Sequence, residues 1–120
     1  PVLAALDARM QDVYWGVYRC AAGGLVEAVG EETVSRPERV AVPPGGGWSG
    51  AGSGWASYGP LLASHCGVAA ADIHVGQQPR AAEVARLAAA VFERAGGVPA
   101  EQAVPVYLRD KVAEKPARRG

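Results

Sequence analysis

Val13-Tyr14-Trp15-Gly16-Val17-Tyr18-Arg19-Cys20 is the stretch of sequence that decides the fold. Its β-branched and aromatic residues favour a β-strand. Because side chains alternate along a strand, Val13, Trp15 and Val17 share one face while the two tyrosines share the other. Both faces of this strand are therefore substantially apolar.

Segments on either side complete a predicted antiparallel meander. The apolar run Val2–Leu6 ends at Asp7, which fits a buried strand followed by a polar turn. Gly23-Gly24 offers the positive backbone φ that a tight hairpin needs, and residues 25–34 alternate well enough to return as a third strand. The sequence predicts three antiparallel strands over residues 2–34.

The rest of the chain predicts helices and one or two further short strands on this meander, which makes the fold class α/β. The weaker patterns are a brief helix near Pro37, a helix over residues 57–64 and a short strand over residues 73–75. The clearest helix begins with Pro79 and ends at Ala95, before Gly96-Gly97. Its narrow, alanine-rich stripe is predicted to pack on the sheet as core.

The segment 104–109 is predicted to be extended, because proline at position 105 disfavours helix at the residue before it. We expect this segment to dock back on the domain, burying Tyr107 and Leu108 and fixing Arg109. The polar residues 114–120 are predicted to form a flexible tail.

Length and composition predict a single α/β domain over residues 1–113 with a thin core. The chain has 120 residues, and 24 of its hydrophobic residues are alanines. No apolar run approaches the ~20 residues that cross a bilayer, and no signal segment opens the chain. We therefore expect a cytoplasmic protein without a membrane partner, in which Cys20 and Cys66 are reduced thiols.

The charge balance excludes one class of function. Twelve basic and twelve acidic side chains give a formal net charge of zero. Non-specific nucleic-acid binding depends on an excess of cations that displace phosphate counterions. Direct nucleic-acid binding is therefore not expected.

Catalytic and metal-binding patterns are weak. A metal site would draw on Cys20, His65, Cys66 and His74, which follow no paired-ligand spacing, and a nucleophile would be sought among Ser53, Ser57, Ser64 and Cys66. None of these nucleophiles stands on a strand-to-helix elbow. We predict no catalytic residue, no metal and no cofactor.

Two features could still hold a ligand. Asp7 and Arg9 follow the first strand, where some nucleotide folds bind phosphate or Mg²⁺, although a turn aspartate that bonds its own backbone, with a neighbouring ion pair, is the favoured explanation. Gly52-Ser53-Gly54 precedes a helix and could cradle a nucleotide. The spacing matches neither the P-loop nor the dinucleotide fingerprint, and a tight strand-to-helix crossing is the simpler explanation.

Three motifs together resemble the C-terminal half of the TsaB (YeaZ) family. They are Asp7-Ala8-Arg9-Met10-Gln11-Asp12-Val13-Tyr14-Trp15, Gly52-Ser53-Gly54-Trp55 and Pro105-Val106-Tyr107-Leu108-Arg109. The family is the accessory subunit in bacterial synthesis of N6-threonylcarbamoyladenosine in tRNA.

The resemblance implies a ribonuclease H-like, actin-like (ASKHA) fold of two similar lobes, of which this chain is the second. Relatives in that superfamily hold ATP with a strand-turn acid and a glycine-rich loop, so Asp7, Arg9, Gly52, Ser53 and Gly54 become candidates for a vestigial nucleotide site. The family is similar to an eroded enzyme that no longer catalyses. The resemblance implies that a TsaD-like partner transfers threonylcarbamoyl to adenosine 37 of tRNA, together with a TsaE-like ATPase.

The sequence departs from the family because it lacks the first half, through which the family usually meets TsaD. It also lacks the paired histidines of TsaD-like proteins, once described as metallo-glycoproteases, so a peptidase activity is not carried over. Pro1 without an initiator methionine indicates a piece of a longer protein. We expect an exposed apolar face that self-association could cover. The alternatives are an ATP-binding half of a sugar kinase-like enzyme and an interaction module unrelated to tRNA.

Overall fold

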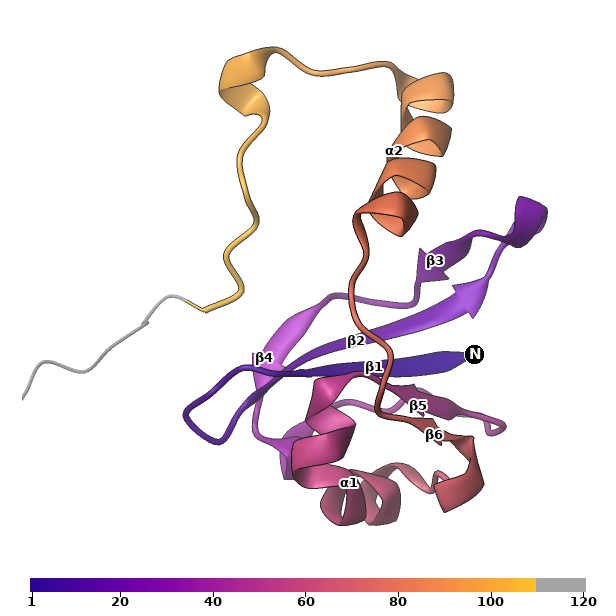
Figure 1. The fold of residues 1–120 in the computed structure, drawn as a ribbon, viewed down its shortest axis with the longest axis vertical. Helices are drawn as coiled ribbons and strands as arrows, with labels where there is room; N and C mark the ends of the chain where they lie inside the picture. Colours follow the sequence, from indigo (N-terminus) through magenta and orange to yellow (C-terminus); the bar gives the residue numbers. More distant parts are fainter. Residues whose placement is uncertain (110–120) are drawn as a thin grey trace, which may run out of the picture.

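The computed structural model describes residues 1–109, in which a six-stranded sheet carries one helix on one face while a second helix stands apart (Figure 1). The strands are β1 (Val2–Asp7), β2 (Val13–Cys20), β3 (Val26–Ala28), β4 (Thr33–Ser35), β5 (Ser49–Ala51) and β6 (Ile73–His74). The helices are α1 (Ser53–Cys66) and α2 (Ala81–Ala95). Short 3₁₀ turns lie at Ala22–Gly24, Pro37–Arg39, Ala70–Asp72 and Ala100–Gln102. The predicted tail at residues 114–120 lies outside the described residues.

The sheet has the order β3-β2-β1-β5-β6, with β4 also paired to β2. Strands β1 and β2 are antiparallel, whereas β5 and β6 run parallel to β1. This confirms the predicted meander and its extension by two short strands. The predicted third strand over residues 25–34 is instead divided into β3 and β4, because Gly30 between them takes a φ of 86° that interrupts the extended backbone.

The core lies between the β1–β2 hairpin and α1. Of the two apolar faces predicted for β2, the one formed by Val13, Trp15 and Val17 is the inner one, since all three are buried. From β1, Leu3 and Ala5 join them. The remaining buried members of this cluster are Val40, Trp48, Trp55, Leu62, Cys66 and Val68. A helix predicted over residues 57–64 is present but longer.

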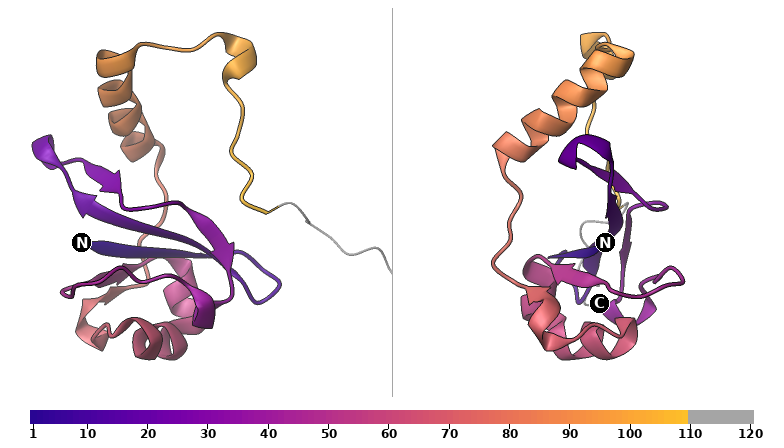
Figure 2. Two further views of the ribbon diagram at one scale, coloured as in Figure 1. Left: turned by 180° about the vertical axis from the view of Figure 1, so that it is seen from behind. Right: turned by 90° about the vertical axis from the view of Figure 1, so that its right-hand side faces the viewer.

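Helix α2 corrects the prediction that its apolar stripe is core. Every residue of α2 is exposed except Ala90, which is half-buried, and the exposed fraction of Phe92 is 65%. Figure 2 shows the helix rising away from the sheet on an extended linker. Helical periodicity reveals an amphipathic surface but does not specify what covers it. The helix also begins at Ala81 rather than Pro79.

The C-terminal segment is extended as predicted, but one detail is wrong. Tyr107 is 77% exposed instead of buried, while Leu108 is half-buried. The segment returns onto the outer face of the β1–β2 hairpin beside an open cavity, so the Tyr107 ring stays exposed to solvent. Among residues 1–109, no helix combines the length and apolarity needed to cross a bilayer.

Candidate functional site

Asp7 lies at the end of β1, where its side chain joins the following turn to α1. Its carboxylate accepts the backbone N–H of Arg9 at 2.8 Å and the Ser57 hydroxyl at 2.7 Å. The Asp7 N–H in turn donates to Ser53 Oγ at 3.0 Å. The hydrogen bonds from Arg9 N–H and then Ser57 lower the pKa of Asp7 below its ordinary value, because they favour the charged carboxylate. This aspartate therefore stays ionised at neutral pH.

The structure brings the predicted glycine-rich segment against the same strand. Gly52 has a φ of 108°, and a Cβ at this position would overlap the carbonyl oxygen of Ala5. A Cβ on Gly54 would lie 2.8 Å from Ala5 Cβ and 2.9 Å from Ala5 C. Close contact between α1 and β1 thus accounts for both glycines. Their role as a vestigial nucleotide site, with Asp7, Arg9 and Ser53, stays a prediction.

The turn between β1 and β2 has an unusual backbone. Arg9, Met10 and Gln11 all have positive φ, at 60°, 52° and 63°. Left-handed conformations cost roughly 1 to 2 kcal/mol for each non-glycine residue. The turn is closed by Ala8 N–H donating to the carbonyl of Asp12 at 2.9 Å. Contacts from outside the turn must therefore help to hold it.

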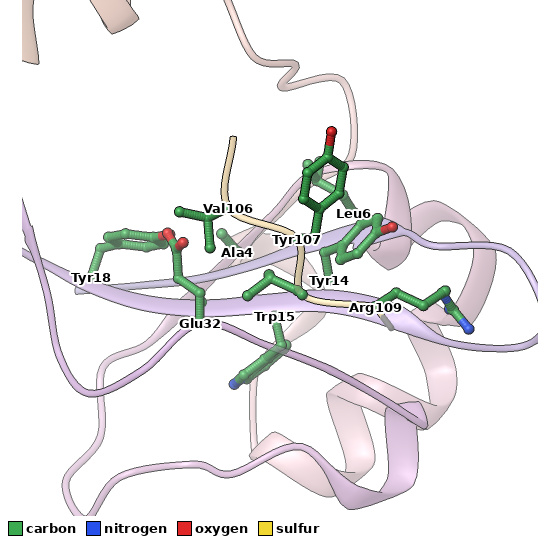
Figure 3. A pocket seen from close by; sticks show the side chains of 11 residues that line it. Ala4, Leu6, Tyr14, Trp15, Tyr18, Glu32, Val106, Tyr107 and Arg109 are labelled. Atoms are coloured by element: carbon green, nitrogen blue, oxygen red, sulfur yellow. The ribbon is translucent and has the colours of Figure 1, made fainter. Parts of the chain in front are cut away.

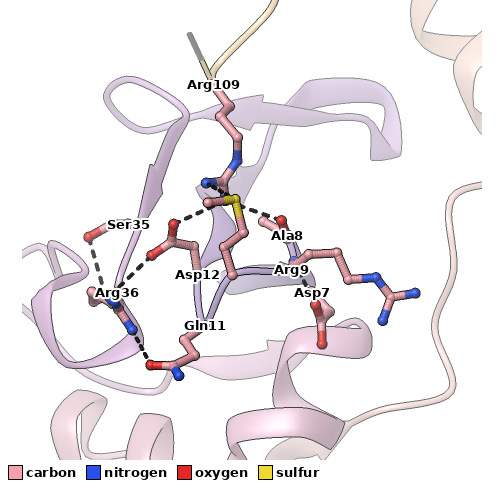
Figure 4. A network of polar contacts seen from close by, with 9 residues as sticks. Asp7, Ala8, Arg9, Gln11, Asp12, Ser35, Arg36 and Arg109 are labelled. Carbon is pink, nitrogen blue, oxygen red and sulfur yellow. Dashed lines mark hydrogen bonds and ion pairs between the residues drawn. The ribbon is translucent and has the colours of Figure 1, made fainter. Parts of the chain in front are cut away.

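Arg109 supplies those contacts from the opposite end of the described chain (Figure 4). Its guanidinium bonds Asp12 Oδ2 at 3.0 Å and donates to the Ala8 carbonyl at 3.1 Å. Only 13% of its side chain is exposed. Arg36 reaches Asp12 from the other side at 3.6 Å. Sequence reasoning named Arg109 but missed Asp12 and Arg36, and the single available signal was that Asp12 closes the same hairpin motif.

The candidate metal ligands do not converge, whereas the nucleophile candidates Ser53 and Ser57 both bond Asp7. The expectation that none of these nucleophiles stands at a strand-to-helix turn is wrong for Ser53, the first residue of α1 after β5. Among residues 1–109, no three His, Cys, Asp or Glu side chains are grouped to hold a metal ion. His65 Nε2 bonds the Val40 carbonyl at 2.9 Å. Cys66 is buried while Cys20 is exposed, and both are free thiols. Burial raises the pKa of Cys66 to about 11, which suppresses the thiolate that nucleophilic chemistry requires.

Thiol labelling should separate the two cysteines. At pH 8, a disulfide reagent such as DTNB is expected to modify Cys20 within minutes and Cys66 only as the domain unfolds, since the thiolate is the reactive form. The folded domain holds the Cys66 proton that the unfolded chain releases, so stability should fall as pH rises from about 9 toward about 11. Cys66→Ala should reduce that alkaline decrease, leaving the part above about pH 10 that the raised pKa of Tyr18 contributes, whereas Cys20→Ala should leave the decrease unchanged. Equal labelling rates would contradict this assignment.

Comparison with known proteins shows which family this chain is related to. TsaB of Escherichia coli, a tRNA threonylcarbamoyladenosine biosynthesis protein, is 37% identical over 117 residues, which is 95% of this chain and 50% of TsaB. The chain is homologous to the C-terminal half of TsaB. The predicted resemblance to the TsaB (YeaZ) family is therefore confirmed. The chain spans about half the length of the curated relative that it matches. No protein-family model matches it.

Two solved structures from Pseudomonas aeruginosa share the TsaB-type fold. YeaZ is 40% identical with a TM-score of 0.73, covering 88% of this chain and 49% of YeaZ. A protein described as similar to peptidase YeaZ is also 40% identical, with a TM-score of 0.74 over 90% of this chain and 49% of its own. These neighbours confirm the predicted ASKHA-type α/β fold.

Proposed function

We propose that this chain is the accessory, non-catalytic lobe of a TsaB-type protein that acts in threonylcarbamoyladenosine biosynthesis on tRNA. The observation that carries the proposal is 37% identity to E. coli TsaB over 95% of the chain. In this role a TsaD-like partner performs the transfer to tRNA, and a TsaE-like protein acts in the same assembly.

The hydrogen bonds and burial of the candidate-site residues favour a structural role over a catalytic one. The Ser57 hydroxyl donates to Asp7, and the Asp7 carboxylate already accepts two hydrogen bonds. Cys66 is buried as a neutral thiol. Gly52 and Gly54 are closed against β1 instead of lining an open loop. Asp7, Ser57 and both glycines therefore each have a structural task, and the Cys66 thiol is not in its reactive form.

Helix α2 offers the surface through which a lobe would be joined to another. Val84, Leu87, Val91 and Phe92 recur at three- and four-residue steps, and their exposed fractions run from 39% to 65%. Burying side chains of this kind contributes roughly 1.5 to 3 kcal/mol each. Both YeaZ structures and TsaB are about twice as long as the part matched here. We propose that this helix face packs on the other half of a TsaB-type protein.

A chimaera tests this function. E. coli TsaB with its matching half replaced by this chain should restore N6-threonylcarbamoyladenosine in the tRNA of cells depleted of TsaB, measured by mass spectrometry of digested nucleosides. Val91→Asp should lower the restored level at least about tenfold, because it places a charge on the apolar face. Ala82→Asp is the matched control, because Ala82 is exposed and lies two positions before Val84, on the opposite side of the helix.

Two outcomes would count against the proposal. A chimaera that accumulates as folded protein yet restores no modification would reject the role in this pathway. Equal modification with Val91→Asp and Ala82→Asp would reject α2 as the joining surface. A pull-down of the chimaera should also retain TsaD, and losing it only in Val91→Asp would link the helix to assembly.

A further inference from the structure

A cavity of about 330 Å³ lies between the outer face of the β1–β2 hairpin and the extended segment 106–109 (Figure 3). This is the sheet face opposite α1. Its lining includes Leu6, Tyr14, Gly16, Tyr18, Glu32 and Tyr107. Cavities of roughly 300 Å³ and above that are mostly apolar, with a few polar groups, are typical of small-molecule sites.

The strand register explains why there is space here. Ala4 of β1 pairs with Gly16 of β2, which sets the two smallest side chains of this face opposite each other. On either side stand larger pairs, Leu6 with Tyr14 and Val2 with Tyr18. A Cβ on Gly16 would meet the Tyr18 ring at 2.7 Å, so glycine lets this ring lie flat across the strand. Ala4 and Gly16 therefore form the base of the cavity, and the rings of Tyr14 and Tyr18 stand beside it.

The polar groups of the cavity point to a hydrogen-bond donor as ligand. The Tyr18 hydroxyl donates to one carboxylate oxygen of Glu32, and burial, followed by the nearby carboxylate, raises the pKa of Tyr18. No other residue of the described chain bonds Glu32, whose second oxygen is open to accept. Arg109, at the other end, is already held by Asp12 and the Ala8 carbonyl. The free polar groups of the cavity are therefore this carboxylate oxygen and the hydroxyls of Tyr14 and Tyr107, and the carboxylate is the strongest acceptor among them.

We propose that this cavity binds a small planar heteroaromatic ring that carries an N–H donor. The ring would lie against the tyrosine side chains, and its N–H would donate to Glu32. Aromatic rings attract one another most in offset or edge-to-face contact, and a hydrogen bond to a charged acceptor is stronger than a neutral one. The carboxylate disfavours phosphorylated ligands, so the class is a free base or an indole. This inference stands independently of the proposed function.

Matched probes test the ring and the donor separately. The full 120-residue protein, labelled with ¹⁵N, is titrated with indole, 1-methylindole and adenine while amide shifts of β1 and β2 are followed. Indole or adenine should give saturable shifts around Ala4, Gly16 and Glu32. The dissociation constant of 1-methylindole should be at least about tenfold higher than that of indole, because methylation removes the N–H. Saturation by adenine alone would identify a base site, and by indole alone an indole site.

Three variants locate the binding. Ala4→Phe should fill the cavity and abolish the shifts. Glu32→Gln should weaken indole binding at least about threefold while retaining the shape of the side chain. Glu31→Gln is the control, because this neighbouring carboxylate does not line the cavity. Thermal unfolding of each variant checks its fold, and if Ala4→Phe does not fold, Glu32→Gln and the methylated probe decide.

The proposal is overturned by any of three results. One is the absence of saturable shifts with both indole and adenine at millimolar concentration. The second is equal affinity for indole and 1-methylindole. The third is binding to Glu32→Gln that matches binding to Glu31→Gln. None of these measurements involves tRNA modification, so their failure is distinguishable from failure of the proposed accessory role.

Discussion

Gly52→Ala and Gly54→Ala are each expected to destabilise the domain by about 2 kcal/mol or more. At Gly52 the added methyl group would overlap the Ala5 carbonyl, and the φ of 108° is one that alanine rarely adopts. At Gly54 the methyl group would press on Ala5 of the central strand. Ala5 cannot move easily to relieve either contact, because it is fully buried in β1. Urea unfolding followed by tryptophan fluorescence measures the effect as a lower midpoint.

Gly59→Ala is the matched control for these two variants. Gly59 lies in the same helix α1, and a Cβ there would meet nothing within 4 Å outside its two chain neighbours. Alanine favours helix over glycine by roughly 1 kcal/mol, but its methyl group would also contact the ring of Pro60, the next residue. These two effects oppose each other, so this variant should change stability much less than Gly52→Ala or Gly54→Ala. If Gly52→Ala instead unfolds at the parent midpoint, close packing is not the reason for the glycine. Saturable Mg²⁺–ATP binding by the parent, lost in Gly52→Ala, would then favour the nucleotide-binding alternative.

The β-hairpin was predictable because its pattern is local and the residues of each face recur at every second position. Alternation of large residues along residues 13–18 specified which side chains share a face, and Asp7 marked the end of the first strand. Which of the two faces is buried became clear only from the structure. The glycine-rich segment was also readable as a tight crossing, since small residues there leave room for a neighbouring backbone. These features depend on nearest neighbours in sequence or on a single strand pair.

The position of α2 was not predictable from the same kind of pattern. Its apolar residues recur with helical periodicity whether the face packs on its own sheet or on another surface. The sheet already carries α1 on one face, and the extended segment returns on the other. Spacing therefore showed that the face of α2 is made for burial without showing the partner.

The contact by which Arg109 holds the turn between β1 and β2 was predictable only in part. Arg109 stood out within a motif, but its partner Asp12 lies 97 residues earlier, and no local rule joins them. The three consecutive left-handed residues in the turn were equally hidden, because Arg9, Met10 and Gln11 carry none of the glycine or asparagine signals of such a conformation. Tertiary contacts override local preference at this turn, and they also decide where Asp7 and Arg9 lie.

Trp55 is the large aromatic side chain that packs α1 against the sheet. It is 1% exposed, its ring fills the space above Gly50, and its centroid lies 6.5 Å from that of Trp15. Its Nε1–H donates to the Leu3 carbonyl at 2.9 Å. Trp55→Ala is therefore expected to cost about 3 to 5 kcal/mol, the usual range for a buried tryptophan truncated to alanine. In a domain of ordinary stability this is a large share of the whole.

Comparison of two conservative variants separates the hydrogen bond from the ring. Trp55→Phe keeps an aromatic side chain but leaves the Leu3 carbonyl without its indole donor, which should add about 0.5 to 1.5 kcal/mol to the loss of packing. Trp48 is also buried, with 6% of its surface exposed, yet its Nε1–H has no partner within the described chain. Trp48→Phe removes that unsatisfied donor, so it should be the milder change. Urea midpoints of both variants decide the question, and a Trp48→Phe loss equal to or larger than that of Trp55→Phe would show that the Trp55 bond does not hold α1 on β1.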